Sequence, residues 1–363
     1  MRYVNLEKNK STPRSRRPNS RKGKTSFFLG VFIIFFILLG FFLISRVSLS
    51  NLLSPIATLS RVVNPKEVQA TEGRTNILLL ALDRRDISPD PNCEESSGLL
   101  TDTIIVASLK TSDEGTGKDA VLLSIPRDLW VDTGYFSGKV NSAYAVGEKN
   151  NDQGTAFASR VVEGVLGLPI HYYAVIDFSG FKQGVDILGG IEVDVEQVFD
   201  DYRYPIPGKE CAEPKESRWE HIHFDAGPQI MDGEKALKFV RSRKAQGPEG
   251  SDFARSRRQQ KVLLAMRDKA LSLSLFSDFG EIRNLYDTFN QSVETNISWP
   301  DVQKLAPLVM NIETVDTHVL DGGQGLLKSV ENNENYGGSW VLVPTAGNFG
   351  DVRDYVSDLL FAK

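Results

Sequence analysis

Two aspartates stand at the ends of segments whose composition predicts buried β-strands. Residues 76–82 form an apolar run that ends in Asp83, and Asp102 directly precedes a second run at residues 103–109. Carboxylates at neighbouring strand ends can hold a hard cation together, and Mg²⁺ is often bound by one or two carboxylates plus phosphate oxygens. The alternative is that both acids only cap turns, the commoner role of acids at strand ends.

An arginine is presented at the end of a third predicted strand, residues 120–125. Pro126 follows this strand and cannot donate a ladder hydrogen bond, so Arg127 is expected at the edge of the sheet. There it would face the same space as Asp83 and Asp102. The alternative is an ordinary surface pair between Arg127 and Asp128, which would contribute little to stability.

The segment from residue 241 to residue 260 has the richest pattern of charged residues. Arg241 and Arg243 end one predicted helix, and Ser251 is a typical N-cap for the next. That second helix carries, at spacings of three and four, one stripe of residues: Asp252, Arg255, Gln259, Val262 and Met266.

The apolar end of this stripe must be buried, so its polar end should also face inward. Buried charges are costly unless they are paired or bind a charged ligand. Arg258 lies beside the stripe and is ambiguous. Convergent guanidiniums bind phosphate bidentately, so the pattern favours a pyrophosphate ligand. The alternative is a solvated basic patch for nucleic acid.

The remaining pattern predicts an α/β layered domain, because strands alternate with helices. Further strands are expected at residues 172–176, 191–195, 317–320 and 340–343. Helices are expected at residues 153–166, 178–188, 232–242, 252–273, 279–289, 300–310 and 352–360. Residues 200–227 are interpreted as an irregular surface excursion, and we expect neither an internal repeat nor a second domain boundary.

The amino-terminal part predicts a single-pass membrane anchor at residues 26–45. Residues 27–44 contain no charged or polar side chain and would span about 27 Å as a helix, close to the hydrocarbon thickness of a bilayer. Residues 1–25 contain nine basic side chains and one acid, which places the amino terminus in the cytoplasm. A cleaved signal peptide is the alternative.

This topology places residues 73–363 outside the cytoplasm, joined to the cell membrane by a linker at residues 46–72. The chain has a net charge of −5 and residues 1–25 carry +8, so the rest carries −13. Such an acidic domain is unsuited to non-specific nucleic-acid binding, and we expect no nucleic-acid partner. The basic segment is better explained by topology and by anionic lipid head groups of the bilayer.

The chain has two cysteines, Cys93 and Cys211. Outside the cytoplasm an even number of cysteines permits a disulfide, but the sequence does not show that these two approach each other. The four histidines lack the spacing of a zinc site.

Seven sequence blocks between Thr75 and Ala270 resemble the LytR-CpsA-Psr family. They are TNILLLALDRRD, LLTDTIIVASL, VLLSIPRDLWVD, KVNSAYAVG, HYYAVIDFSGFKQGVDILGGIEVDV, MDGEKALKFVRSR and SDFARSRRQQKVL. The resemblance implies a central mixed β-sheet flanked by helices. It also implies a phosphotransferase that moves a glycosyl-phosphate polymer, of the wall teichoic acid or capsule type, from a polyprenyl-pyrophosphate carrier to a peptidoglycan sugar hydroxyl.

The resemblance also assigns roles to individual residues. Asp83 and Asp102 match the family's aspartates for Mg²⁺ (or Mn²⁺). The expected pyrophosphate ligands are Arg127, Arg241, Arg243, Arg255 and Gln259, with Arg85 a weaker match. Asp252 is a further acid of the site; with Asp83, Asp102 and Arg127 it makes up the expected catalytic set. Either Asp252 or a metal-site aspartate is the expected proton acceptor.

The family further implies a channel for the lipid chain between the sheet and its helices. The candidate lining residues are Val161, Val165, Phe178, Phe181 and Leu188, for each of which ordinary core packing is the alternative. The chain departs from the family pattern at Ala81, Leu82 and Leu100 and in the length of the loop between Asp83 and Asp102. Two other functions stay open: a hydrolase of polyprenyl pyrophosphate, and a non-enzymatic wall-binding or regulatory protein.

Overall fold

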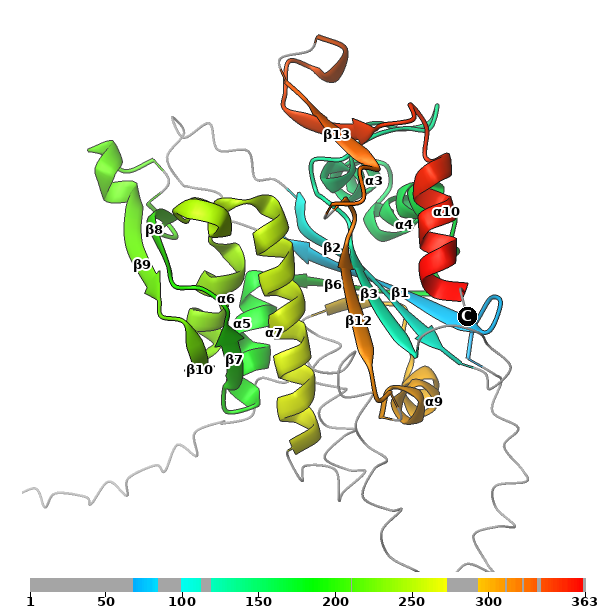
Figure 1. Ribbon diagram of the computed structural model, residues 1–363, viewed down its shortest axis with the longest axis horizontal. Coiled ribbons are helices and arrows are strands. Elements are labelled where there is room, and N and C mark those ends of the chain that lie inside the picture. The colour runs from blue at the N-terminus through cyan, green and yellow to red at the C-terminus, as the bar shows by residue number, and fades with distance from the viewer. Residues whose placement is uncertain are drawn as a thin grey trace, which may run out of the picture.

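The computed structural model describes residues 68–83, 99–111, 119–209, 211–272, 293–310, 312–321, 323–331 and 334–361. Its centre is a six-stranded sheet with the order β11-β6-β1-β2-β3-β12 (Figure 1). β1 pairs antiparallel with β2 and parallel with β6, and β3 pairs antiparallel with β2 and parallel with β12. The expected mixed sheet flanked by helices is therefore confirmed.

The strands are β1 Arg74–Leu82, β2 Thr101–Lys110, β3 Ala120–Ser124, β4 Trp130–Asp132, β5 Ser137–Lys139, β6 Tyr172–Asp177, β7 Ile191–Val195, β8 Phe199–Pro205, β9 Trp219–Phe224, β10 Gly227–Met231, β11 Val293–Thr295, β12 Val315–Val319, β13 Leu327–Val330 and β14 Val341–Pro344. The α-helices are α3 Ala143–Lys149, α4 Gly154–Leu166, α5 Phe178–Ile187, α6 Gly233–Arg241, α7 Asp252–Ser272, α9 Trp299–Met310 and α10 Gly350–Phe361. Short 3₁₀ turns occur at Val140–Ser142, Lys215–Arg218, Gly247–Gly250 and Glu334–Tyr336.

Both faces of the central sheet are covered, which explains the continuous apolar composition of β1. Side chains alternate along a strand, so Leu78 and Leu80 point to one face and Ile77 to the other. Leu78 and Leu80 pack in a core with residues of α3, α4 and α10. Ile77 packs in a second core with residues of α9 and with the part of α7 that faces the sheet.

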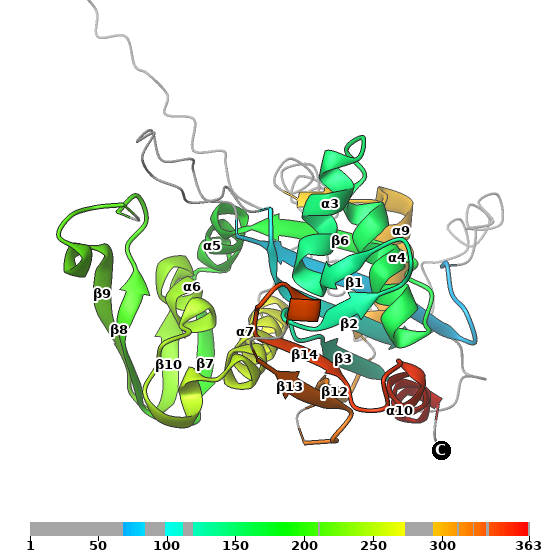
Figure 2. The same cartoon turned by 90° about the horizontal axis from the view of Figure 1, so that it is seen from above.

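A third core lies beside the sheet and contains α5, α6 and the strand pairs β7–β10 and β8–β9. α7 stands between this group and the central sheet in both views (Figures 1 and 2). Val262 and Met266 of α7 pack into the third core, whereas Leu264 packs against the core of the sheet. α7 is therefore a shared wall that is covered on two sides.

The expectation of an irregular excursion at residues 200–227 is wrong. β8 and β9 form an antiparallel pair, and β10 pairs with β7. The long apolar run that marks the central strands is absent here, because these strands bury only alternate residues such as Phe199 and Ile222. The strands β4, β5, β11 and β13 and the helix α3 were also not anticipated from the sequence, whereas β14 matches the strand expected at residues 340–343.

Among the described residues, no helix is both long enough and apolar enough to cross a bilayer. The expected anchor at residues 26–45, the linker up to residue 67 and the expected helix at residues 279–289 lie outside the described residues. These three expectations stay predictions.

Arg258 of α7 holds the end of α6 in place. Its side chain is 4% exposed, and it donates from Nε to the carbonyl oxygen of Phe239 (2.9 Å) and from Nη2 to that of Ser242 (2.7 Å). Its Nη1 donates to the carbonyl oxygen of Glu249 (2.9 Å) and forms an ion pair with the Glu249 carboxylate (2.6 Å). The ambiguous arginine of the sequence is therefore a structural one that fixes where α6 stops, and with it the positions of the residues that follow.

We predict that Arg258→Met lowers the free energy of unfolding by about 3 kcal/mol, because the Glu249 carboxylate and three carbonyl oxygens lose their buried partner. Arg257→Met is the matched control. The Arg257 side chain is exposed, so its substitution should lower the free energy of unfolding by less than about 0.5 kcal/mol. Urea unfolding of the full chain in detergent measures both. Equal effects of the two substitutions would contradict the role assigned to Arg258.

Candidate active site

Asp83 and Asp102 meet at one edge of the central sheet. β1 and β2 are antiparallel and Leu82 pairs with Thr101, so the end of one strand lies beside the start of the other. The Asp83 N–H donates to the carbonyl oxygen of Leu100 (3.0 Å), which continues this pairing. The side chains of Asp83 and Asp102 are 12% and 18% exposed. The structure thus brings both predicted acids to the same place.

Arg127 lies between three carboxylates. Its guanidinium pairs with Asp102 (2.6 Å) and Asp128 (3.1 Å), and its Nε lies 4.0 Å from Asp252. Burial by itself lowers the pKa of Arg127, but these carboxylates outweigh it and raise the pKa above its usual value. Arg127 is therefore a fixed cation at the sheet edge, and Lys139 balances Asp128 from its other side at 2.6 Å.

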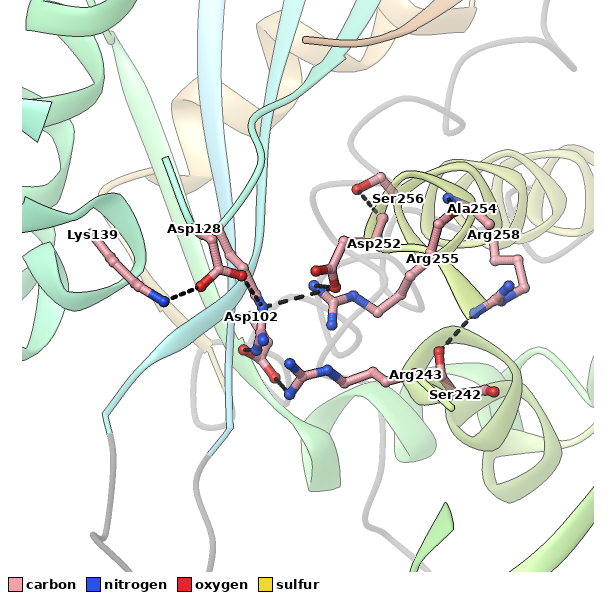
Figure 3. Close-up of polar contacts among 12 residues, drawn as sticks. Asp102, Asp128, Lys139, Ser242, Arg243, Asp252, Ala254, Arg255, Ser256 and Arg258 are labelled. Carbon is pink, nitrogen blue, oxygen red and sulfur yellow. Dashed lines mark hydrogen bonds and ion pairs between the residues drawn. The ribbon is translucent and has the colours of Figure 1, made fainter. Parts of the chain in front are cut away.

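The end of α6 supplies two more guanidiniums. The buried Asp201 accepts hydrogen bonds from the Ser242 hydroxyl (2.8 Å) and the Arg243 N–H (3.2 Å), which fixes the turn after the helix. Arg241 lies over the ring of Phe178, 3.9 Å from its centroid, and its Nη2 is 3.8 Å from Asp83. Arg243 Nη1 lies 4.0 Å from Asp102 Oδ2. The two side chains point toward each other in Figure 3.

The start of α7 supplies Asp252, Arg255 and Gln259. Arg255 is 3% exposed, and its Nη2 pairs with Asp252 at 2.9 Å. Its Nε and Nη1 atoms are buried without a hydrogen-bond partner. Burial lowers the pKa of Arg255, opposed in part by Asp252, and nearby Arg127 lowers it further. An arginine stays charged in proteins, so these two donors call for an anionic acceptor.

An apolar cavity of about 430 Å³ opens onto these groups. Its polar end is formed by Asp83, Asp102, Arg241, Arg243, Arg255 and Gln259. Its long apolar part lies between the sheet and α7, with lining side chains that include Ile77, Leu79, Ile105, Phe178, Phe181, Val262 and Met266. The cavity is therefore charged at one end and apolar along the rest of its length.

Of the residues expected to line a lipid channel, only Phe178 and Phe181 are among those that line this cavity. Val161 and Val165 belong to the core on the opposite face of the sheet, and Leu188 belongs to the core of the third group. Their helical spacing showed that they are buried, but not on which side of the sheet.

A smaller pocket of about 20 Å³ adjoins the same charged groups. Its walls include Arg127, Asp128, Asp252 and Trp340, and it shares Asp102, Arg255 and Gln259 with the larger cavity. Lys139 and Trp340 were not predicted as site residues from the sequence. Both come from short hairpin-like segments far along the chain, where the local pattern carries no signal of proximity to Asp102.

Two predicted site residues, Arg85 and Cys93, lie outside the described residues. Cys211 is disulfide-bonded. The pairing of Cys211 with Cys93, the other cysteine of the chain, stays a prediction.

In the described part of the chain no group of three or more His, Cys, Asp or Glu side chains is arranged to hold a metal ion. Asp83 and Asp102 nevertheless line one cavity at its charged end. Two carboxylates suit Mg²⁺ when phosphate oxygens and water complete its shell. The donor set therefore fits a metal that binds together with a phosphate ligand.

Comparison with known proteins identifies the lineage of the chain. The sequence model of the LytR_cpsA_psr family matches residues 53–346. The chain belongs to the LytR-CpsA-Psr family.

Two teichoic acid transferases are similar to the chain over most of its length. TagU of Oceanobacillus iheyensis is 30% identical over 82% of this chain and 83% of its own, and TagT of Bacillus subtilis is 29% identical over 71% and 70%. Both are polyisoprenyl-teichoic acid–peptidoglycan teichoic acid transferases.

Solved structures of the family share the fold. The crystal structure of B. subtilis TagV has a TM-score of 0.56 at 26% identity and covers 80% of this chain and 98% of that one. The structure of TagT bound to LI-WTA has a TM-score of 0.54 at 25% identity and covers 81% and 94%. The mixed sheet and its flanking helices are therefore those of the LytR-CpsA-Psr family.

We predict that inorganic pyrophosphate stabilises the protein, because it would supply acceptors for the buried donors of Arg255. At about 100 times its Kd a ligand adds about 2.7 kcal/mol to the free energy of unfolding. The measurement is the shift of the melting temperature on adding pyrophosphate. Arg255→Lys should lose most of the shift, because an ammonium cannot bind bidentately, whereas Arg257→Lys should keep it. An undiminished shift in Arg255→Lys would contradict this assignment.

Proposed function

We propose that this protein transfers a glycosyl-phosphate polymer from a polyprenyl-pyrophosphate carrier to a sugar hydroxyl of peptidoglycan. Its relatives TagU and TagT, which are polyisoprenyl-teichoic acid–peptidoglycan teichoic acid transferases, support this proposal. The observation that carries the proposal is one apolar cavity that ends in converging arginines and carboxylates. A lipid-linked pyrophosphate has the same two parts, a long hydrocarbon chain and a compact group of anionic oxygens.

The reaction breaks the phosphoanhydride bond of the carrier and forms a phosphodiester bond to the acceptor sugar. The acceptor hydroxyl oxygen forms a bond to the phosphorus that carries the sugar, and the bond from this phosphorus to the bridging oxygen breaks. Polyprenyl phosphate leaves, and the hydroxyl proton passes to a base. Phosphoryl transfer of this kind needs positioning and neutralisation of charge more than covalent catalysis.

In this proposal Arg127, Arg241, Arg243 and Arg255 bind the pyrophosphate oxygens, with Gln259 as a neutral donor. The partly buried surroundings strengthen their attraction for phosphate, since water screens them less. Arg255 has two donors without a partner, and so it gains most from the ligand. Arg241, held over Phe178 at the junction with the apolar part, is placed for the phosphate nearest the lipid.

Asp83 and Asp102 would hold Mg²⁺ (or Mn²⁺), which when bound would neutralise charge on the phosphate oxygens. Both carboxylates already have arginine neighbours, Arg241 at 3.8 Å from Asp83 and Arg127 at 2.6 Å from Asp102. These ion pairs keep the carboxylates oriented toward the cavity.

Asp252 is the proton acceptor in this proposal. Its side chain is 37% exposed, against 12% for Asp83 and 18% for Asp102, so an incoming hydroxyl can reach it. The ion pair with Arg255 holds its carboxylate at the first turn of α7. A base at this point lies next to the arginines that bind the phosphate.

The reaction also fits the predicted topology. A carrier lipid stays in the bilayer, so the enzyme must work at the membrane surface where peptidoglycan is found. An anchor at residues 26–45 with its amino terminus in the cytoplasm would keep the site there, in contact with both partners.

We predict that Arg127→Ala and Arg241→Ala each lower transfer by about 10²–10³-fold, the usual cost of losing one charge-stabilising group. The assay follows labelled polymer from its lipid carrier to peptidoglycan, using the full chain in detergent, with Arg257→Ala as the control that should keep wild-type activity. Wild-type protein that releases polymer into solution at the same rate with and without peptidoglycan would instead be a hydrolase. Wall attachment that survives both substitutions would favour a binding role.

We predict that chelation of divalent cations lowers transfer and that Mg²⁺ or Mn²⁺ restores it. Asp83→Asn should raise the concentration of Mg²⁺ needed for half-maximal activity, because the site loses one anionic ligand. The Mg²⁺ titration of wild type and Asp83→Asn in the same assay measures this. Asp232→Asn, which alters an acid at the amino-terminal end of α6, is the control with an expected unchanged titration. Full activity in excess chelator would contradict a metal requirement.

A further inference from the structure

Two pockets meet at the charged groups, and the reaction proposed above accounts for only one. The larger, apolar cavity suits the lipid and its pyrophosphate. The smaller pocket joins it at Asp102, Arg255 and Gln259, and its other walls include Asp252 and Trp340. The carboxylate proposed as the base therefore faces the smaller pocket, and is not among the residues that line the larger one.

The size of the smaller pocket limits what it can hold. About 20 Å³ is a little more than the ~10–15 Å³ that one water molecule needs. A single hydroxyl group fits, and a sugar ring does not. The rest of an acceptor would have to lie outside, against the residues at the pocket mouth.

Trp340 is placed at this pocket and is 37% exposed. The segment that carries it is fixed to the site: the Leu342 N–H donates to the Asp128 carbonyl oxygen (3.0 Å), and Leu342 forms a bridge with Leu129. Trp130 and Tyr336 add an edge-to-face contact, with ring centroids 5.2 Å apart. A large aromatic ring is thus held partly open to solvent beside Arg127 and Asp128.

An indole suits a sugar ligand. It offers a flat apolar face to the C–H groups of a sugar ring and a polar N–H at its edge. Burial of this face against a ligand would also remove exposed apolar surface from water.

The chemistry of phosphoryl transfer fixes the direction of approach. The attacking and leaving oxygens lie roughly in line on opposite sides of the phosphorus. The leaving polyprenyl phosphate must point into the apolar cavity, because its lipid lies there. The attacking hydroxyl therefore comes from the other side of Arg255 and Gln259, where the smaller pocket lies.

We propose that the smaller pocket and Trp340 form the acceptor subsite, in which a peptidoglycan sugar stacks on Trp340 and inserts one hydroxyl between Asp252 and Arg127. This inference rests on the proposed transfer function. The hydroxyl oxygen bonds to phosphorus, its proton passes to the Asp252 carboxylate, and polyprenyl phosphate leaves through the apolar cavity. Trp340 is a positioning residue that contacts the acceptor and not the donor.

The test compares wild type, Trp340→Ala and Trp340→Phe as full chains in detergent. The donor is a lipid-linked wall teichoic acid precursor and the acceptor is a soluble peptidoglycan oligosaccharide. We expect Trp340→Ala to raise the KM for the oligosaccharide about five- to tenfold, the range that one aromatic contact provides, and Trp340→Phe to restore part of it. Binding of inorganic pyrophosphate, followed by the melting shift, should be unchanged. Tyr202→Ala, which removes an exposed ring on β8, is the matched control.

The outcomes separate this inference from the proposed function. If wild type transfers polymer and Trp340→Ala has an unchanged KM for the oligosaccharide, the acceptor subsite is wrong and the function stands. A loss of pyrophosphate binding in a folded Trp340→Ala protein would place Trp340 on the donor side and also overturn the inference. If wild type gives no transfer to any acceptor, the proposed function itself fails.

Discussion

The central constraint on this structure is the burial of Arg255 next to Arg127. Two guanidiniums in a partly dry environment repel each other, and each has lost most of its contact with water. Two carboxylates offset this repulsion. Asp252 lies on α7 and pairs with Arg255, and Asp102 lies at the sheet edge and pairs with Arg127. The balance is incomplete, since two donors of Arg255 stay without a partner, and this deficit is what defines the site as a receptor for an anion.

Strand pairing and one helix-to-helix contact bring these charged side chains together. Antiparallel pairing of β1 and β2 sets Asp83 beside Asp102, and Arg127 lies three residues after the end of β3. The carboxyl-terminal end of α6 and the amino-terminal end of α7 both lie at this edge of the sheet. Hydrogen bonds from Arg258 of α7 to the last turn of α6 hold the two ends together. The same sheet and the same helix α7 then continue away from the charges as apolar surfaces, so the cavity between them changes character along its length.

Much of this could be predicted from the sequence, because the signals were local. The apolar runs of β1, β2 and β3 located the strand ends, and the spacing from Asp252 to Met266 showed that charged and apolar residues share one side of α7. Contacts between distant segments left no such signal. The strands β8 and β9 bury only alternate side chains, and Trp340 reaches the site through a backbone pairing between Leu342 and Leu129 that no local pattern encodes. For the same reason spacing showed that Val161 and Phe181 face the interior but not that they lie in different cores.

Because α7 packs against two cores, it sets a fixed distance between the charged end of the cavity and its apolar part. Arg255 at one end of this helix faces the phosphates, and Met266, eleven residues further on, lines the apolar part of the cavity. At about 1.5 Å per residue these two points are about 16 Å apart, a length that packing on both sides keeps constant. In a carrier with a much longer hydrocarbon chain, only the units next to the pyrophosphate can be measured against this helix, and the remainder stays with the bilayer. Selection among carriers would then depend on the first few units of the lipid and be indifferent to its total length.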